Sequence, residues 1–323
     1  MKIRNAFRRG FSLMIHHRMI IGIIYLVNLC IALLFAVPTF ILFHEKVGAL
    51  LLRDDLLSGL PYSWWSSFHF NAEGLEKTIR PSLAGFGPLL DNLELLLTGQ
   101  IQSYGWFVIC IGLAYLFIAA FFNGGAIALY ADERRSFSTG RFLSFAGTYF
   151  HHMAALAVTT LVLFALVFKV IQPAIFSLVD QVVGDSLSQS FAWSINLIGY
   201  ALILVLIFLL TLILDYAKVI LISEKKNSSW ICIGLAAAFI FRNAHKTIGL
   251  NLLLVLLAAA LVLVAGLLSM INSSQLLLLI LGFIFQQLFI AAKIATRLTF
   301  YAAETALYQE YAAARETVKK RKR

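Results

Sequence analysis

An acidic and a basic residue stand three positions apart inside one of the most apolar stretches of the chain. The stretch reads LTLILDYAKVILISEKK, from Leu210 to Lys226, and it contains Asp215 and Lys218. Ionisable side chains within a membrane-spanning segment are costly and usually mark ion, proton or substrate chemistry. The same side chains at the edge of a membrane are ordinary structural charges, so their depth has to be estimated first.

The depth of Asp215 follows from helix geometry. It lies about 20 residues after the start of its apolar run, which corresponds to about 30 Å of helix and to the thickness of the hydrocarbon layer. On the last apolar run, Lys293 and Arg297 reach the same level when residues are counted from Leu276. A buried carboxylate needs a charged or hydrogen-bonding partner. We therefore predict a cluster of Asp215 with Lys293 or Arg297 at the membrane edge.

Two interpretations of this cluster are open. In the first, Asp215, supported locally by Lys218, holds two spans together, and the absence of charges near mid-membrane favours this structural role. In the second, the same cations bind the anionic headgroup of a lipid or substrate. The most deeply placed polar residues are neutral: Asn28, Gln286 and Gln287. They predict hydrogen bonds between helices, with a polar pathway through the membrane as the alternative.

The sequence contains no catalytic or metal-binding motif. G-x-S-x-G and paired intramembrane carboxylates are absent, so we predict no catalytic residue and no cofactor. Two histidine pairs, His16-His17 and His151-His152, suggest a metal, but neighbouring histidines on a helix point about 100° apart. We expect them to face lipid headgroups and predict no metal site.

The composition is that of a helical membrane protein. Of 323 residues, 61% are hydrophobic and 13% are charged, and the mean hydropathy is +0.87. Soluble domains carry about twice that charged fraction. The net charge of +10 comes from basic residues that flank apolar runs, which predicts contacts with lipid headgroups rather than with nucleic acid.

Six runs are long enough to cross a membrane, and each needs about 20 apolar residues. The first follows a basic segment and is too long for a signal peptide, so we expect it to be an uncleaved span. Between the first two runs lies a loop over 45–103, and a basic tail covers 309–323. The predicted spans are 19–43, 105–131, 154–178, 191–214, 247–268 and 276–300.

Lysine and arginine positions predict the orientation. They gather before the first span, after each even-numbered span and in the tail, whereas 179–190 and 269–275 contain none. By the positive-inside rule both termini lie in the cytoplasm.

The chain also shows a weak internal repeat. The segments FSLMIHHRMIIGIIYL, FAGTYFHHMAALAVTTL and FIFRNAHKTIGLNLLLVLL each place a polar joint before an odd-numbered span. We infer three helical hairpin units, with short interfacial amphipathic helices that include Ser136 to Tyr149 and Ser228 to Arg242. Trp64 and Trp65 in the long loop, and Trp230, are expected to be membrane-interface anchors.

The runs NGGAIALYADERRSFSTGRFLS and DYAKVILISEKKNSSWICIGLAAAFIFRNAHKTIGLNLLLVLL resemble an uncharacterised group of bacterial six-span inner-membrane proteins with a D-Y-A-[KR]-V segment. The group is similar to YciC-type proteins and to the membrane domain of some glycerophosphodiester phosphodiesterases. The resemblance covers about two-thirds of the chain and implies a helical bundle in the bacterial inner membrane. It carries no activity or catalytic residue.

The sequence therefore predicts an all-α polytopic membrane protein that is non-enzymatic. The leading hypothesis is that it binds lipid or another amphiphile, through anionic headgroups at the cytoplasmic face, or supports a membrane assembly with a protein partner or a second copy of itself. One alternative is a small transporter, which needs a polar cavity at Asn28, Gln286 or Gln287. A lower one is a lipid-modifying enzyme, which needs Asp215 to meet His151 or His152.

Overall fold

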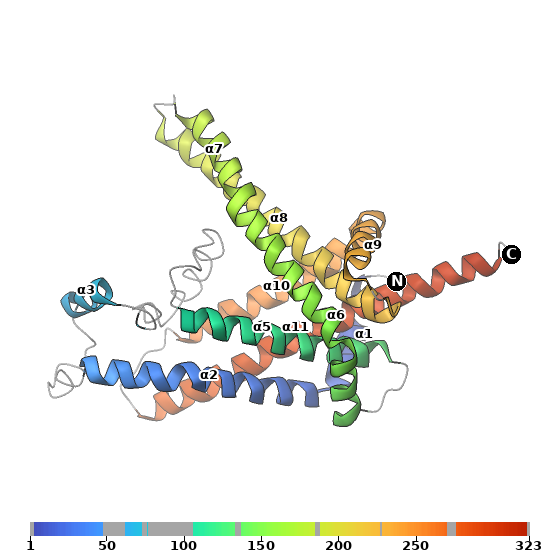
Figure 1. Ribbon diagram of the computed structural model, residues 1–323, viewed down its shortest axis with the longest axis horizontal. Helices are drawn as coiled ribbons and strands as arrows, with labels where there is room; N and C mark the ends of the chain where they lie inside the picture. Colours follow the sequence, from blue (N-terminus) through green and yellow to red (C-terminus); the bar gives the residue numbers. More distant parts are fainter. Residues whose placement is uncertain are drawn as a thin grey trace.

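The computed structural model describes residues 3–47, 62–72, 76, 106–132, 137–184, 188–226, 228–269 and 276–321. Within these ranges the regular structure is helical and contains no β-strand (Figure 1). Continuous apolar sequence explains this outcome, because a helix satisfies every internal backbone hydrogen bond within its own segment.

In the part of the chain that the structure describes, six helical segments are long and apolar enough to cross a membrane. This confirms the prediction of an all-α polytopic membrane protein, and the chain is a multi-pass membrane protein. The segments are α2 (Met19–Val47), α5 (Trp106–Ala131), α6 (Thr139–Leu166) continued through η4 (Val167–Ile171) and α7 (Gln172–Val183), α8 (Gln189–Ser223), α10 (Ala244–Ser269) and α11 (Leu276–Arg321).

Three shorter helices accompany them: α1 (Ile3–His16), α3 (Tyr62–Asn71) and α9 (Ser229–Arg242). The segment Ser228 to Arg242 forms the separate short helix that the sequence predicted. The segment Ser136 to Tyr149 does not, because its helical part is the first half of α6, which continues without a break to Leu166. No proline interrupts this stretch, and the histidine pair that suggested a joint is accommodated within the helix.

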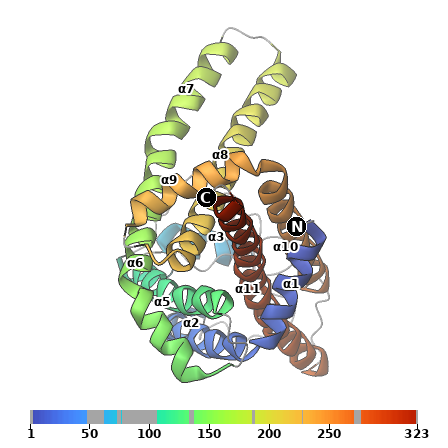
Figure 2. The same cartoon turned by 90° about the vertical axis from the view of Figure 1, so that its right-hand side faces the viewer.

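Most residues buried from solvent gather at one end of the molecule, and a smaller cluster of Val167, Ile203 and Ile207 lies in the hairpin of α6 and α8. Continuous buried stretches occur at 124–130 in α5 and at 298–308 in α11, and 214–222 in α8 is buried except for the half-buried Lys218. Figures 1 and 2 show that both chain termini lie at this end, which we call the terminal end. Toward the other end the spans expose large apolar side chains such as Leu34, Val162 and Leu256. Lipid can cover such surfaces, because its tails are as apolar as the side chains.

Glycines allow the helices at the terminal end to approach closely. A Cβ atom on Gly125 in α5 would lie 2.9 Å from the carbonyl oxygen of Phe142 in α6. A Cβ atom on Gly10 in α1 would lie 2.5 Å from Cα of Ala303 in α11. The Gln309 amide of α11 also donates to the carbonyl of Ala131, the last residue of α5, at 3.0 Å. The stretch 298–308 of α11 is thus enclosed by other helices.

One pair of helices diverges from the rest. The hairpin of α6, η4 (Val167–Ile171) and α7 (Gln172–Val183) with α8 points away from α2, α5, α10 and α11 (Figure 1). The π-turn η4 precedes Pro173, and the Gln172 N–H donates to the carbonyl of Val167 five residues earlier. A wider turn at this point relieves the clash that a proline ring makes with the preceding turn.

Gly125→Ala is expected to lower the free energy of unfolding by about 1–3 kcal/mol, as overpacking at a tight contact does. The physical reason is the backbone oxygen of Phe142, which cannot move without shifting α6. Thermal unfolding in detergent measures the effect. Gly112→Ala on the same helix is the control, because a Cβ there meets no atom within 4 Å. Equal melting temperatures for the two variants would contradict the close crossing.

Candidate functional site

The carboxylate of Asp215 joins two helices at the terminal end. Asp215 lies on α8 and is 1% exposed. Its Oδ1 atom accepts a hydrogen bond from Lys218 Nζ at 2.8 Å, one turn later on the same helix. The same atom accepts from Arg297 Nη2 of α11 at 3.1 Å. The cross-helix contact that the sequence predicted is therefore made with Arg297.

Arg297 is held on one side and open on the other. Its Nε donates to the Tyr301 hydroxyl at 3.1 Å, and its guanidinium carbon lies 4.7 Å from the centre of the Tyr301 ring. The side chain is nevertheless 45% exposed. We call Asp215, Lys218, Arg297 and Tyr301 the clasp. It positions one cation of α11 while leaving part of that cation accessible.

Lys293 lies one turn before Arg297 on α11 and is exposed. Residues four apart on a helix share a face, so the two cations are neighbours on the same side of α11. The ion pairs that Asp215 makes with described residues are to Lys218 and Arg297. Lys293 is thus an exposed cation one turn from the clasp, on the same face of α11 as Arg297.

A second buried carboxyl lies behind the clasp. Glu304 of α11 is 1% exposed, and its Oε1 accepts from Asn251 Nδ2 of α10 at 3.4 Å. It lies within electrostatic reach of Asp215, Arg297 and Lys218. Within the part of the chain that the structure describes, Glu304 Oε2 and the buried Tyr216 hydroxyl have no hydrogen-bond partner.

Glu304 and Asn251 were not predicted from the sequence, although the spacing of Glu304 from Arg297 was a usable signal. Glu304 follows Arg297 by seven residues, which places both on one face of a helix after two turns. The predicted sixth span ended at residue 300, so Glu304 was counted outside the bundle. In the structure α11 continues to Arg321 and remains buried through Tyr308.

The predicted mid-membrane residues differ in their surroundings. Gln287 Oε1 accepts a hydrogen bond from the Tyr25 hydroxyl at 2.7 Å, which joins α11 to α2. Gln286 is exposed, and Asn28 on α2 is half-buried. The bond of Gln287 is of the interhelical kind that the sequence predicted for these amides.

The predicted interface tryptophans lie on short helices. Trp64 and Trp65 are half-buried on α3, and the Trp64 ring stacks on Phe68 with a centroid distance of 5.0 Å. Trp230 on α9 is 66% exposed. Apart from 45–47, 62–72 and 76, the long loop over 45–103 lies outside the described residues.

The position of His17 differs from the one expected from the sequence. This residue was expected to face headgroups, but it is 2% exposed at the joint between α1 and α2. Its ring packs against Tyr130 and Phe137, and its Nδ1 atom has no hydrogen-bond partner among the described residues. Burial lowers the pKa of His17, and the nearby charges of His16 and Arg141 act in the same direction while Asp132 opposes them. The closure of the joint by aromatic rings explains this burial.

In the described part of the chain, no group of three or more His, Cys, Asp or Glu side chains is placed to hold a metal ion. Comparisons with protein-family models, curated proteins and solved structures found no match for this chain.

Asp215→Asn is expected to lower the free energy of unfolding by about 3 kcal/mol, because it leaves Lys218 and Arg297 without the counter-charge of the buried carboxylate. Thermal unfolding in detergent measures the change. Asp180→Asn makes the same substitution at an exposed site on α7 and should alter stability by no more than about 0.5 kcal/mol. Equal shifts in the two variants would show that Asp215 does not hold α8 to α11.

Stability should also depend on pH through His17. Because its pKa is lowered from 6.5 in the folded protein, the folded state favours the neutral ring. The contribution of the neutral His17 ring to the free energy of unfolding is complete above pH 6.5. It is lost as the pH falls from 6.5 through the folded-state pKa.

Melting temperatures recorded across this interval test the expectation. His17→Phe should flatten the acid-side decline, whereas His16→Phe at the exposed neighbouring position should leave it in place. A decline that persists unchanged in His17→Phe would exclude His17 as its source.

Proposed function

We propose that this multi-pass membrane protein is non-enzymatic and binds the anionic headgroup of a membrane amphiphile at the open side of the clasp. The observation that carries the proposal is Arg297, which is fixed by the buried Asp215 yet 45% exposed. Lys293 lies beside it on the same face of α11. Two adjacent cations at the edge of an apolar helix suit a phosphate group, to which arginine donates two parallel hydrogen bonds.

The charges at this place favour an anion. Asp215 contributes one negative charge, and Lys218, Lys293 and Arg297 contribute three positive charges, so the formal sum is −1 + 3 = +2. Counting the buried Glu304 as ionised still leaves +1. An anionic headgroup would neutralise this excess, and its binding would offset the cost of keeping the cations away from bulk water.

The surroundings suit an acyl chain. Phe283 and Ile290 precede Arg297 by fourteen and seven residues, which puts all three on one face of α11. Both apolar side chains are exposed. An amphiphile with its phosphate at Lys293 and Arg297 would lie with its tail along these residues, where contact with hydrocarbon carries no cost.

The orientation that we propose places the terminal end in the cytoplasm. The basic segments of the sequence support it, because cytoplasmic leaflets carry anionic lipids that attract lysine and arginine. The location in a bacterial inner membrane stays a proposal that rests on the resemblance to the six-span group with the D-Y-A-[KR]-V segment. The hydrogen bond between Gln287 and Tyr25 supports a structural role for that amide rather than a place in a transport pathway.

Native mass spectrometry of the protein in nanodiscs tests the proposal. Discs containing phosphatidylglycerol should give a protein ion with one retained anionic lipid, and discs of phosphatidylcholine alone should not. Lys293→Gln should weaken retention about fivefold, since a basic residue near a lipid surface contributes about 1 kcal/mol.

The matched control is Lys169→Gln, which removes an exposed lysine from the diverging hairpin. It should leave retention unchanged. Equal losses in the two lysine variants, or equal retention of phosphatidylcholine, would refute a specific site at the clasp.

A further inference from the structure

The second buried acid of the terminal end, Glu304, lacks the partners that hold Asp215. Asp215 accepts hydrogen bonds from two cations, whereas Glu304 accepts one from the neutral amide of Asn251 at 3.4 Å. The other oxygen of Glu304, Oε2, has no hydrogen-bond partner among the described residues, and the residue is 1% exposed. Two acids at the same end of the molecule therefore lie in contrasting surroundings.

An ionised carboxylate at the position of Glu304 would be costly. A buried charge needs partners or water, and a carboxylate that has neither is neutralised by binding a proton. The hydroxyl of Tyr216 could donate to an ionised carboxylate. It lies within electrostatic reach of Glu304, yet it is also buried and without a hydrogen-bond partner among the described residues. These surroundings favour the neutral acid.

The two cations of the clasp are engaged elsewhere. Lys218 and Arg297 both lie within electrostatic reach of Glu304, but both form their ion pairs with Asp215. Asp215 is itself within reach of Glu304 and repels a second negative charge. The clasp therefore compensates one carboxylate and leaves the other to be neutralised by a proton.

The other helices near this part of α11 turn their charged groups away. α1 approaches α11 closely at Ala303, and the arginines of α1 are exposed. At the start of α10 the basic side chains are exposed as well, and in α5 the ring of Tyr130 packs against His17. The exposed basic residues are Arg4, Arg8, Arg9, His245 and Lys246.

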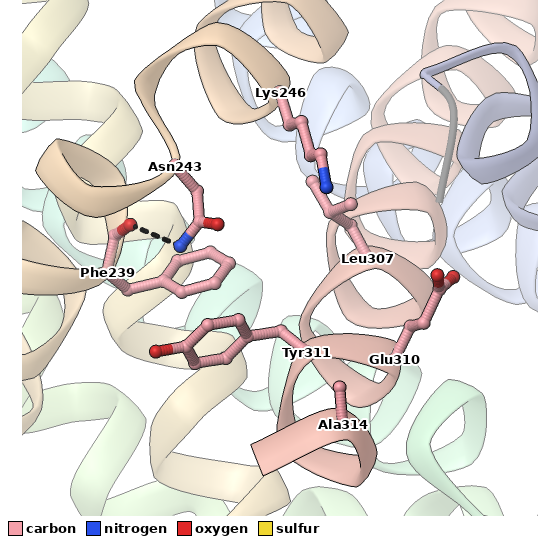
Figure 3. A pocket seen from close by; sticks show the side chains of 7 residues that line it. All are labelled: Phe239, Asn243, Lys246, Leu307, Glu310, Tyr311 and Ala314. Atoms are coloured by element: carbon pink, nitrogen blue, oxygen red, sulfur yellow. Dashed lines mark hydrogen bonds between the residues drawn. The ribbon is translucent and has the colours of Figure 1, made fainter. Parts of the chain in front are cut away.

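The next acid along α11 has a different environment. Glu310 lines an open pocket of about 130 Å³ between α10 and α11, and its carboxylate points away from Tyr311 (Figure 3). Glu304 is not among the residues that line this pocket. Glu310 thus provides a control with the same charge on the same helix, at a position that solvent reaches.

We propose that Glu304 binds an exchangeable proton and that this proton controls the binding of an anionic headgroup at the clasp. The inference rests on the proposed function and adds its regulation. Glu304 follows Arg297 by seven residues, about 10 Å along the same face of α11. With the proton bound, the formal charge around the clasp is +2, and it falls to +1 when the proton leaves to bulk water.

The direction of the coupling follows from this charge change. The protonated protein binds an anionic headgroup more tightly, because the ionised Glu304 would repel it. By thermodynamic linkage, a bound headgroup strengthens the binding of the proton to the same extent.

Infrared spectroscopy of the full chain in a maltoside detergent tests proton binding in the absence of lipid. A protonated carboxyl group has a C=O band separate from the carboxylate bands, and this detergent has no ester carbonyl to obscure it. We expect such a band at neutral pH, its loss on raising the pH, and its absence in Glu304→Gln. Glutamine copies the shape of the neutral acid, so this variant should keep the fold.

Glu310→Gln is the matched control for the infrared measurement and should leave the band in place. The same band in Glu304→Gln, or no acid band at neutral pH, would overturn the proton site. A band that persists up to the alkaline unfolding of the protein would overturn its exchange with water.

Native mass spectrometry in phosphatidylglycerol nanodiscs tests the coupling on either side of the pH at which the band is lost. The unchanged chain should retain the lipid about tenfold better on the acid side, as expected for unit charges about 10 Å apart at an effective dielectric constant of about 20. Glu304→Gln should retain the lipid equally well at both pH values. Glu310→Gln should behave as the unchanged chain does, because its position is about 20 Å from Arg297 along the helix and its charge is screened.

The two measurements separate this inference from the proposed function. Lipid retention that does not change with pH, in a protein that shows the acid band, would overturn the coupling and leave the headgroup site intact. No retention at either pH, in the unchanged chain and in Glu304→Gln alike, would refute the headgroup site and the coupling with it. The infrared band decides the proton site in both cases.

Discussion

The buried carboxylate of Asp215 links the diverging hairpin to the other spans. Asp215 on α8 accepts hydrogen bonds from Lys218 and Arg297, and α8 belongs to the hairpin that points away from the other spans (Figure 1). In lipid, apolar faces have little preference for one another over the surrounding chains. The ion pair between the buried Asp215 and Arg297 is directional, so it holds α8 to α11 where contact between their apolar surfaces would not.

The other helices pack most closely at the same depth as Asp215 and Arg297. Buried residues of α5, α8 and α11 gather at the terminal end, and α1 docks there through the close contact of Gly10 with Ala303. Beyond this level the spans separate and expose leucine, valine and phenylalanine side chains. Arg297 lies where the packed end gives way to the open one, which explains how its guanidinium is both anchored and accessible.

Part of the candidate site could be predicted from the sequence. The helix rise per residue predicted that Asp215 lies at the same depth as Lys293 and Arg297. The structure contains the contact between Asp215 and Arg297. The choice between the two cations could not be made, because residues four apart share a helix face and differ in depth by about 6 Å. Glu304 was missed because hydropathy ended the span at 300, whereas protein contacts keep α11 buried beyond that point.

The sequence by itself determined the number of spanning helices and their class. Each crossing requires about 20 apolar residues, and a helix is the segment that satisfies its own backbone in lipid. The tertiary structure alone decided which cation binds Asp215, that Asn251 meets Glu304, and that His17 is enclosed at a joint. These outcomes depend on how helices rotate and cross. That choice is made by close contacts such as Gly125 with Phe142, which join residues distant in the chain and leave no periodic signal within one segment.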